Sequence, residues 1–424
     1  MSDNNHDQRV VVTGLGTVTP LGNSVDALWQ GLLAGRTTVH RIEKFDPSAF
    51  HVQIASEVSD FNIEDYADYL DKKEAKRMDP LQHYCIACTA QAMKQANLKV
   101  DESNADEIGV VIGSGIGGLQ VIDQGYHALF EKGPMRVSPF TGPYMIPNMG
   151  PGQVAISFGP RGPNFSVVSA CASGTNAIGE AYEIIRRGDA QAMITGGAES
   201  LITPFGLAAF HRTQAMSTRN DDPQHASRPF DAKRDGFVYG EGAGVLVLER
   251  LDFAKQRGAK ILAEMIGYAC NDDAYHISAP AEGGTGAARA MAKALRKAGI
   301  QPEEVDYINA HGTSTVLNDA AETTAIKTVF GEYAYAVPIS STKSMLGHLM
   351  GAAGGVEAVV TVKTILEGWI HATINYENPD PQCDLDYVPN VPRQKQVKIA
   401  MSNSFGFGGH NATVIFKKYE ESNE

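Results

Sequence analysis

Short, largely apolar runs recur along the chain and predict β-strands. Such runs cover Arg9–Thr13, Gly109–Ile112 and Val305–Asn309, and each has a length typical of strands. Between them, apolar residues recur at helical spacing, as in the stretch Leu81–Leu98. Strands that alternate with helices favour an α/β fold in which helices cover a mostly parallel sheet.

A strand–turn–helix pattern occurs once in each half of the chain. The run Phe165–Val168 leads into residues 169–174 (SACASG), and a helical stretch rich in alanine and glycine follows. The run Ala336–Ile339 leads into residues 340–348 (SSTKSMLGH), and a second helical stretch of small residues follows. Because an internal repeat of this kind indicates a duplicated unit, we expect two related halves.

Each half then closes on a glycine-rich turn and a final strand, in the segments Gly240–Leu248 and Phe405–Phe416. Helices built from small side chains can lie deep between two sheets, because their backbones approach closely. We therefore predict an α/β fold with a five-layer α-β-α-β-α duplication. Residues 1–258 form its first half and residues 259–424 its second, with a shared central site.

The composition is that of a globular protein, since 43% of the 424 residues are hydrophobic and 20% are charged. The formal net charge of −13 argues against nucleic acid or an anionic membrane as the main partner. Residues 1–9 are polar and lack the apolar core of a signal peptide, and no apolar stretch approaches the ~20 residues that span a bilayer. The sequence thus predicts a cytoplasmic protein that binds neither nucleic acid nor a membrane.

The five cysteines are Cys85, Cys88, Cys171, Cys270 and Cys383. An odd, sparse set in a chain without a predicted leader indicates reduced thiols. The Cys85-x-x-Cys88 pair lies in a helical stretch, and no second cysteine pair completes a zinc site. We interpret both as buried structural thiols.

Cys171 is the candidate nucleophile. It lies where an apolar strand meets a helix, and the positive end of the helix dipole favours a thiolate there. A sharp strand-to-helix turn also exposes a side chain for reaction. On its own, Cys171 is equally consistent with a buried structural thiol.

Two histidines have a matching position. His311 follows the strand predicted at Val305–Asn309, and His348 ends the second strand–turn segment. Active sites of α/β proteins gather at such strand exits, and histidine titrates near neutral pH. Together with Cys171, the pair favours a catalytic site.

One glycine-rich segment imitates a cofactor motif. Residues 113–118 match G-x-G-x-x-G after a strand, but a dinucleotide domain usually opens the chain with it. The N-terminal turn has Gly14 and Gly16 but Thr19 where the third glycine belongs. With no P-loop, His-Glu-x-x-His or EF-hand pattern either, we predict no cofactor and no catalytic metal.

Two further segments have a structural and a functional interpretation. Residues 403–411 (NSFGFGGHN) fit either a plain β-turn or a flexible gate with an oxyanion-binding amide. In the densest basic run, Lys73, Lys76 and Arg77 share one face of a helix. Such a run is most often a solvated face.

Together these motifs resemble the β-ketoacyl-acyl-carrier-protein synthase II family, elongating condensing enzymes of the thiolase superfamily. The resemblance spans nearly the whole chain and rests on residues 170–174 (ACASG), 311–315 (HGTST) and 343–348 (KSMLGH) and on the turn at Phe407. The order Cys-His-His differs from the Cys-His-Asn set of initiating synthases and from the second cysteine of thiolases. A thiolase-like fold is implied.

The resemblance implies a decarboxylating Claisen condensation in fatty acid elongation, with a discrete polyketide-type ketosynthase as the alternative. Cys171 would take an acyl group from an acyl-acyl-carrier protein, with the amides of Cys171 and Phe407 as the oxyanion hole. His311 and His348 would stabilise the enolate formed when malonyl-acyl-carrier protein loses carbon dioxide. Lys343 would organise the site electrostatically.

Further roles follow from the same resemblance, together with a homodimer and with no cofactor. Glu322 and Glu357 would lie near Lys343, and a structural monovalent cation would lie near Asn309, Glu357 and Ser402. The chain departs from many relatives at Gln214, Leu346 and His410. The remaining assignments are Ile116, Phe210 and Phe407 for the acyl pocket and its gate, Thr313 and Thr315 for pantetheine, and Lys73, Lys76, Arg77 and Arg136 for carrier-protein docking.

Overall fold

The computed structural model describes residues 8–421. Ten strands form one hydrogen-bonded series, and the two halves of the chain supply five each. The first half supplies, in spatial order, β1 (Val10–Val18), β8 (Gly242–Arg250), β6 (Ala192–Glu199), β4 (Ile108–Gly113) and β5 (Asn164–Val167). The second half supplies β9 (Ala263–Asp272), β15 (His410–Lys417), β14 (Ile399–Gly406), β10 (Tyr307–Asn309) and β11 (Ile339–Ser340).

The two sets of five strands pair in the same way. In the first, β1 and β6 lie antiparallel to β8, while β4 lies parallel to both β6 and β5. In the second, β9 and β14 lie antiparallel to β15, while β10 lies parallel to both β14 and β11. The predicted duplication is confirmed. The sets join where Val10–Val12 of β1 pair with β9, a link that the sequence did not predict.

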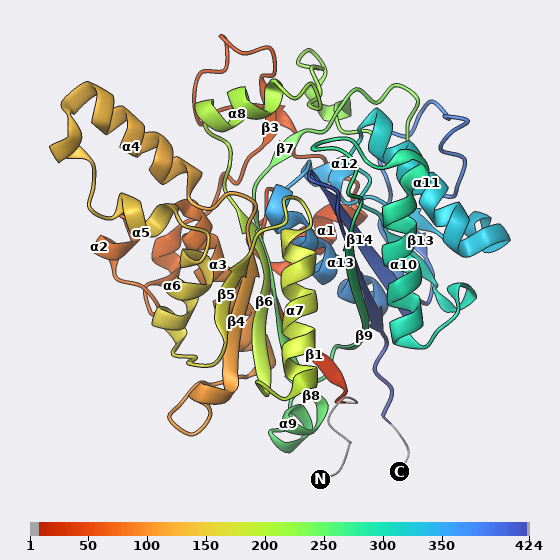
Figure 1. Cartoon of the computed structure of the whole chain (residues 1–424), viewed down its shortest axis with the longest axis horizontal. Coiled ribbons are helices and arrows are strands. Elements are labelled where there is room, and N and C mark those ends of the chain that lie inside the picture. The colour runs from red at the N-terminus through yellow and green to blue at the C-terminus, as the bar shows by residue number, and fades with distance from the viewer. Residues whose placement is uncertain (1–7, 422–424) are drawn as a thin grey trace.

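Helices form the other three layers (Figure 1). The middle layer holds α7 (Ser173–Arg187) and α13 (Ala353–Glu367), and each contacts strands of both halves. On the outer faces, α3 (Pro80–Ala96) packs on β1 and β8, while α10 (Thr285–Ala298) packs on β9 and β15. The five-layer α-β-α-β-α arrangement predicted from the sequence is therefore confirmed.

Small residues make the middle layer possible. A Cβ atom added to Gly244 of β8 would lie 2.4 Å from the carbonyl carbon of Gly355 in α13. A Cβ on Gly355 would lie equally close, 2.4 Å, to the carbonyl oxygen of Gly244. Since neither position has room for a side chain, glycine on both sides lets the helix backbone rest on the strand.

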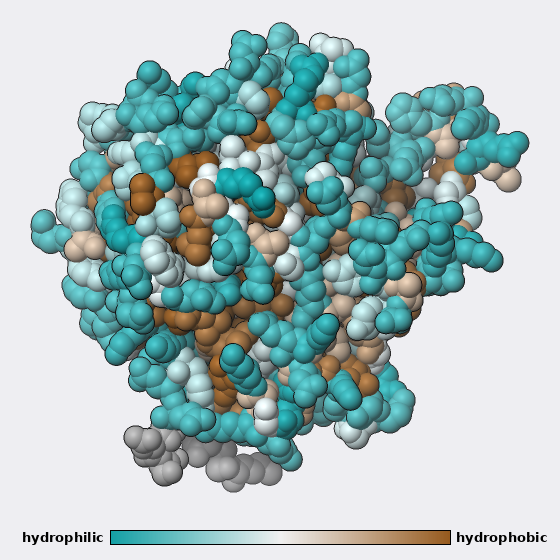
Figure 2. Space-filling view, turned by 180° about the vertical axis from the view of Figure 1, so that it is seen from behind, coloured by the Kyte–Doolittle hydropathy of each residue, from teal (hydrophilic) through white to brown (hydrophobic). Residues whose placement is uncertain are grey.

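The remaining elements surround this core. Short strands form two small sheets, β2 (His40–Arg41) with β3 (Ile54–Ser56) and β7 (Tyr239–Gly240), and β12 (Trp369–Ile370) with β13 (Arg393–Gln394). The other helices are α1 (Val25–Leu33), α2 (Lys72–Ala75), α4 (Leu119–Lys132), α5 (Thr141–Met145), α6 (Met149–Phe158), α8 (Pro204–His211), α9 (Leu251–Gln256), α11 (Val316–Phe330) and α12 (Lys343–Leu346). Of these, α4 stands off from the body as an arm, which Figure 2 shows from behind at the upper right.

Several local predictions can be compared with these elements. The helix expected at Leu81–Leu98 is α3, and Cys85 and Cys88 are buried within it. Of the basic run, only Lys72 and Lys73 lie in a helix, the single turn α2, which ends at Ala75. Lys76 and Arg77 follow its last residue, so the helix expected to carry them is shorter than the sequence predicted. Residues 1–7, which bear on the predicted absence of a leader, lie outside the described residues. No helix within residues 8–421 is long and apolar enough to cross a membrane. We propose that the halves divide at residues 258/259, between α9 and β9.

Candidate active site

The carboxyl ends of the parallel strands meet at one edge of the two sheets, near the upper end of α7 in Figure 1. Loops of α/β proteins that follow such strand ends commonly build the active site. In order of the strands that precede them, the residues concerned are Ile116 after β4, Cys171 after β5, Glu199 at the end of β6, His311 after β10, Lys343 and His348 after β11, and Phe407 after β14. Both halves of the chain therefore contribute to one place.

A hollow of about 260 Å³ lies at this edge. It brings together six residues to which the sequence analysis gave a role: Cys171, His311, Thr313, Thr315, His348 and Phe407. Gln214, one of the three departures from many relatives, also lines it. The loop Ser278–Pro280, which no motif had indicated, also lines it. The predicted constellation is thus assembled in space although its members are up to 236 positions apart, from residue 171 to residue 407.

Cys171 lies two positions before Ser173, the first residue of α7, and its side chain is buried. The residue before it, Ala170, has a left-handed φ of +50°, which marks a sharp turn. Burial raises the pKa of the thiol to about 11, although the positive charge of Lys343 and the amide of Phe407 act to lower it. Burial therefore opposes the thiolate that the helix end was expected to favour, and it outweighs the contacts that stabilise the charge.

The glycine-rich turn connects β14 to β15 and lies against the nucleophile. A Cβ on Gly406 would be 3.0 Å from the amide nitrogen of Cys171, so the two backbones are in close contact. The amides of Phe407 and of Cys171 itself both act to lower the pKa of the thiol. Backbone donors that favour a negative charge at this sulfur can also bind an oxyanion formed beside it. The ring of Phe407 stacks on Phe210, with the centroids 6.5 Å apart.

The two histidines lie side by side. Their rings are nearly perpendicular, with centroids 5.4 Å apart, and each residue is 2% exposed. Burial and the nearby charge of Lys343 lower the pKa of both His311 and His348 well below the usual value, so both rings are neutral at pH 7. His348 Nδ1 accepts a hydrogen bond from the amide of Met350 (3.3 Å), which places its proton on Nε2. Within residues 8–421, neither His348 Nε2 nor His311 Nδ1 has a partner.

Two buried carboxylates at the start of α11 hold the loop that carries His311. Glu322 accepts the amides of His311 and Gly312, each at 2.8 Å, one on each carboxylate oxygen. Asp319 accepts the amide of Thr313 at 3.1 Å. The sequence analysis missed Asp319; its position three residues before Glu322, on the same helix face, is the signal that would have indicated it.

Lys343 and Glu357 form an ion pair in which both side chains are 2% exposed. Burial raises the pKa of Glu357, against the effect of Lys343. Three buried oxygen atoms nearby have no partner among the described residues: Glu357 Oε2, Asn309 Oδ1 and Ser402 Oγ. Asn309 and Ser402 are neighbours in the paired strands β10 and β14. Unpartnered buried acceptors are uncommon in proteins, and a cation is one group that satisfies them.

Of the three residues expected at the acyl pocket and its gate, only Phe407 lines the hollow. Ile116 and Phe210 are partly buried and pack against a core cluster that contains Cys171, Tyr239 and Leu201. Neither of them lines the hollow. The structure therefore shows an open side, next to Thr313 and its neighbours, and a closely packed side beyond the thiol.

The four basic residues Lys73, Lys76, Arg77 and Arg136 are exposed and lie outside the hollow. The guanidinium of Arg77 lies 4.2 Å from the ring centroid of Phe140, which joins the segment after α2 to the start of α5. Arg136 lies only four positions before Phe140. The basic residues thus come from two neighbouring surface segments.

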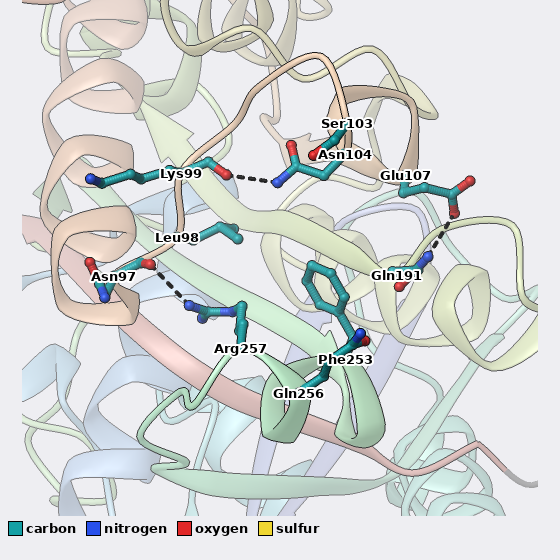
Figure 3. A pocket seen from close by; sticks show the side chains of 10 residues that line it. All are labelled: Asn97, Leu98, Lys99, Ser103, Asn104, Glu107, Gln191, Phe253, Gln256 and Arg257. Atoms are coloured by element: carbon teal, nitrogen blue, oxygen red, sulfur yellow. Dashed lines mark hydrogen bonds between the residues drawn. The ribbon is translucent and has the colours of Figure 1, made fainter.

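A larger hollow, of about 610 Å³, is lined by none of the candidate catalytic residues (Figure 3). Its lining residues include no cysteine or histidine. Its polar groups are largely bonded to one another: Arg257 donates to the carbonyl of Asn97, Asn104 to that of Lys99, and Gln191 to Glu107. The volume alone therefore does not mark the reactive site.

Comparisons with known proteins agree with the geometry. Over 413 residues, the chain is 55% identical to 3-oxoacyl-[acyl-carrier-protein] synthase 2 of Synechocystis, covering 97% of this chain and 99% of that protein. It is 51% identical to the protein of the same name from Staphylococcus aureus, covering 98% and 99%.

Solved structures give the same result for the fold. A beta-ketoacyl synthase from Burkholderia phymatum is 38% identical, with a TM-score of 0.90 over 98% of this chain and all of that one. AntDE:AntF, described as a type II polyketide synthase acyl-carrier protein in complex with its ketosynthase, is 34% identical, with a TM-score of 0.90 over 97% and 100%. The fold is therefore that of the ketosynthases in the thiolase superfamily.

Family models divide the match between the two halves. Residues 7–254 match the beta-ketoacyl synthase N-terminal domain, and residues 262–377 match the beta-ketoacyl synthase C-terminal domain. The first contains Cys171 and the second contains both His311 and His348. The chain belongs to the beta-ketoacyl synthase family.

Proposed function

We propose that the protein catalyses a decarboxylating Claisen condensation in fatty acid elongation, joining an acyl group on Cys171 to malonate on an acyl-carrier protein. The observation that carries the proposal is the meeting of Cys171, His311 and His348 in one hollow, with unpartnered histidine nitrogens. The relatives named 3-oxoacyl-[acyl-carrier-protein] synthase 2 support the same reaction and carrier.

In the first half-reaction, the sulfur of Cys171 attacks the carbonyl carbon of an acyl thioester. The carbonyl oxygen becomes an oxyanion, and the amides of Cys171 and Phe407 would donate to it. The bond to the carrier sulfur then breaks, and the thiol proton leaves with the carrier thiolate. Because the pKa of the Cys171 thiol is raised to about 11, this proton must be displaced as the new bond forms.

In the second half-reaction, a malonyl thioester loses carbon dioxide, and the electron pair of the broken bond forms an enolate. His348 Nε2–H and a ring nitrogen of His311 donate to the enolate oxygen. Although both rings are neutral, each keeps one N–H group and can therefore still donate. The enolate carbon attacks the acyl group, and the Cys171 thiolate leaves and regains a proton.

Lys343 sets the charges in this arrangement. Its ammonium group acts to lower the pKa of both histidines and that of the Cys171 thiol, which favours the neutral form of the histidines and the charged form of the cysteine. The first effect keeps the histidines neutral, and the second favours the thiolate that leaves after condensation. Glu357 balances the charge of Lys343 and so makes its burial tolerable.

The substrate arms fit the two sides of Cys171. The hydroxyls of Thr313 and Thr315 share a hydrogen bond of 2.9 Å in the wall of the hollow, where the amide-rich pantetheine arm would pass. The acyl chain would enter the apolar side, among Ile116, Phe210 and Phe407. Since that side is closely packed, the acyl chain requires these side chains to move apart.

The exposed residues Lys73, Lys76, Arg77 and Arg136 would dock the carrier protein. A local basic surface on a chain with a net charge of −13 steers an acidic partner. A neighbour of similar fold is described as a ketosynthase in complex with its acyl-carrier protein. An R77E variant tests the docking: its KM for carrier-bound substrates should rise, while its KM for the same acyl group on free pantetheine should not. Equal effects on both would contradict the docking role.

We also propose a homodimer formed across strand β5. This strand is the last of the sheet series, so one side of its backbone has no strand beside it in the described chain. Apolar side chains surround it: Ile156 is 71% exposed, Phe165 41% and Val168 56%. Since an exposed apolar sheet edge favours pairing, a second copy would cover it. Light scattering should give a dimer for the natural chain and a smaller species for F165E; a monomeric natural chain would refute the proposal.

A monovalent cation would fit the unpartnered oxygens Asn309 Oδ1, Glu357 Oε2 and Ser402 Oγ. Oxygen donors of this kind suit such an ion. The bound ion would stabilise the structure and would contribute to the balance of charge beside Lys343. The thermal midpoint of unfolding should rise with added potassium chloride more than with a chloride salt of a bulky organic cation. In an S402A variant the difference between the salts should shrink; if it is unchanged, the cation lies elsewhere.

Purified protein with acyl- and malonyl-acyl-carrier protein tests the reaction itself. A 3-oxoacyl-carrier product and released carbon dioxide are expected, and no product with any acyl chain would refute the function. C171A should abolish covalent acylation of the protein. C171Q should retain malonyl decarboxylation but not condensation; loss of both in a folded variant would contradict the separate roles of the cysteine and the histidines.

A discrete polyketide-type ketosynthase is the second candidate. Two ketosynthases with TM-scores of 0.90 and 0.91 that are 34% identical favour it, since one is described as part of a type II polyketide system and the other as a ketosynthase/chain length factor. The chemistry at Cys171 is common to both. A single extension of saturated acyl chains by the purified chain alone indicates the fatty acid enzyme; a requirement for a second subunit indicates the polyketide type.

A further inference from the structure

Glu199 ends strand β6 at the same sheet edge as the proposed catalytic residues. The other five parallel strands each lead to a residue with a role in the proposed reaction, whereas Glu199 has none. Its side chain is completely buried. A buried carboxylate without a function is costly to maintain, so its contacts indicate what it does.

The carboxylate joins the two halves of the chain. Glu199 Oε2 accepts the amide of Gly115 at 2.6 Å and the amide of Gly351 at 3.0 Å. Glu199 Oε1 accepts the hydroxyl of Ser114 at 2.9 Å, and that hydroxyl in turn accepts the amide of Gly117 at 3.0 Å. Gly115 and Gly117 flank Ile116, whereas Gly351 follows the segment that carries His348.

The contact at Gly351 leads directly to His348. Two residues lie between them, and the second, Met350, has a left-handed φ of +48°, which costs energy for a residue with a side chain. Its amide is the donor that fixes the tautomer of His348. A hydrogen bond from the next amide, that of Gly351, to Glu199 holds this strained turn in place.

The two segments pack so closely that no side chain fits between them at Gly115 or Gly351. A Cβ on Gly351 would lie 2.3 Å from the amide nitrogen of Gly115 and 2.5 Å from Glu199 Oε2. A Cβ on Gly115 would lie 2.9 Å from the same oxygen. The turn of one half and the segment of the other therefore touch through their backbones, with the carboxylate of Glu199 as their shared acceptor.

We propose that Glu199 is a positioning residue that fixes the turn bearing Ile116 against the segment bearing His348, so that the acyl pocket and the decarboxylating histidine keep one relative geometry. This inference rests on the function proposed above. Glu199 acts through its neighbours and does not touch the substrate. One carboxylate thus links the acyl-binding and malonate-activating parts of the site, which come from different halves of the chain.

A second, electrostatic effect separates this role from a purely structural one. Three titratable groups feel the charge of Glu199, namely Cys171, Cys85 and Tyr239, and the pKa of each is raised in part by it. Lys343 acts on Cys171 in the opposite direction. Burial raises the pKa of Glu199 itself to about 7. Removal of its charge should therefore lower the pKa of the Cys171 thiol.

Two substitutions separate the effect of the charge of Glu199 from that of its side-chain length. In E199Q, the side-chain oxygen can still accept the amides of Gly115 and Gly351, and the new amino group can donate to the Ser114 hydroxyl. In E199D the charge remains, but a side chain one methylene shorter cannot reach all three donors. E249Q is the matched control, because Glu249 is equally buried at the far end of the paired strands β6 and β8.

Alkylation of Cys171 by iodoacetamide, followed by mass spectrometry across pH, measures the charge effect without any substrate. Half-maximal alkylation should move to lower pH in E199Q and stay unchanged in E249Q. Decarboxylation of malonyl-acyl-carrier protein measures the positioning. It should fall about tenfold or more in E199D, the effect of weakening one hydrogen bond to a charged group, and less in E199Q.

An unchanged alkylation profile in E199Q, together with natural decarboxylation by E199D, would overturn the inference. A profile shift in E249Q equal to that in E199Q would do the same, because the effect would then not be local. Failure of the proposed function gives a different result: the natural chain itself would not decarboxylate the malonyl carrier, whereas the alkylation shift in E199Q would persist.

Discussion

Substitution of Glu322 tests whether its hydrogen bonds position the loop that carries His311. Its two carboxylate oxygens accept the amides of His311 and Gly312, one each, at 2.8 Å. In E322Q, one of these amides must face the amino group of glutamine whichever way the side chain turns. One buried donor thus loses its acceptor, at a cost of ~1–3 kcal/mol in the free energy of unfolding. In E322A both donors lose it, and the cost becomes ~2–6 kcal/mol by the same reasoning.

Substitution of Glu322 should affect the two half-reactions to different extents. The carboxylate holds His311, whereas Cys171 is positioned by other contacts, so decarboxylation should fall more than acylation. A displaced donor to an oxyanion reduces rates by ~10²–10³-fold, which sets the scale for decarboxylation by E322Q. Denaturant unfolding measures the first effect, and mass spectrometry of malonyl-carrier turnover and of acylated Cys171 measures the second. E322Q with natural stability and natural decarboxylation would refute the reasoning.

Three further substitutions test other contacts of the site. K343M removes the charge that lowers the pKa of the Cys171 thiol, so half-maximal alkylation by iodoacetamide should require a higher pH; a shift to lower pH would contradict the electrostatic role. G406A places a Cβ 2.9 Å from the carbonyl oxygen of Ser169, so the turn should move off the nucleophile and acylation should slow, as rapid-quench assays can show. R234M removes donors to the carbonyl of Thr315 at 3.1 Å and to Asp380, so the KM for carrier substrates should rise more than kcat falls.

The features that the sequence predicted depend on short, continuous stretches of the chain. Cys171 and the segment ending at His348 follow corresponding strands, β5 and β11, and each strand–turn–helix pattern is complete within a short stretch. Such patterns depend on residue types at fixed spacing, which one sequence displays directly. The duplication, the five layers and the meeting of the two segments could therefore be inferred before the structure.

The glycine-rich segment 113–118 shows how a local motif can mislead. Its first glycine is needed because a Cβ there would lie 2.2 Å from the carbonyl oxygen of Ser173 in α7. Gly117 has a left-handed φ of +93°, which few other residues adopt. Close packing and turn geometry thus account for glycines that also match a dinucleotide fingerprint. The sequence analysis predicted no cofactor for this segment because of its position in the chain.

What the sequence did not predict depends on contacts between distant segments. Glu199 and Asp319 are ordinary acidic residues in the sequence, and only the fold shows that each accepts backbone amides from other segments. The raised pKa of Cys171 likewise depends on the depth of burial, which a favourable position near a helix end does not reveal. Desolvation and long-range hydrogen bonding are properties of the packed chain, so residue type and spacing do not determine them.

The charges at the site explain why Lys343 is buried at all. The proposed reaction uses two neutral histidines as donors to an enolate, and it uses a cysteine that leaves as a thiolate, which a positive charge nearby stabilises. One buried ammonium group meets both requirements, because it disfavours a second cation on His311 or His348 and favours an anion on Cys171. Placed on the surface, the same charge would be screened by water and would do neither effectively. The ion pair with Glu357 is therefore the condition under which one buried charge can favour both the neutral histidines and the leaving thiolate of the second half-reaction.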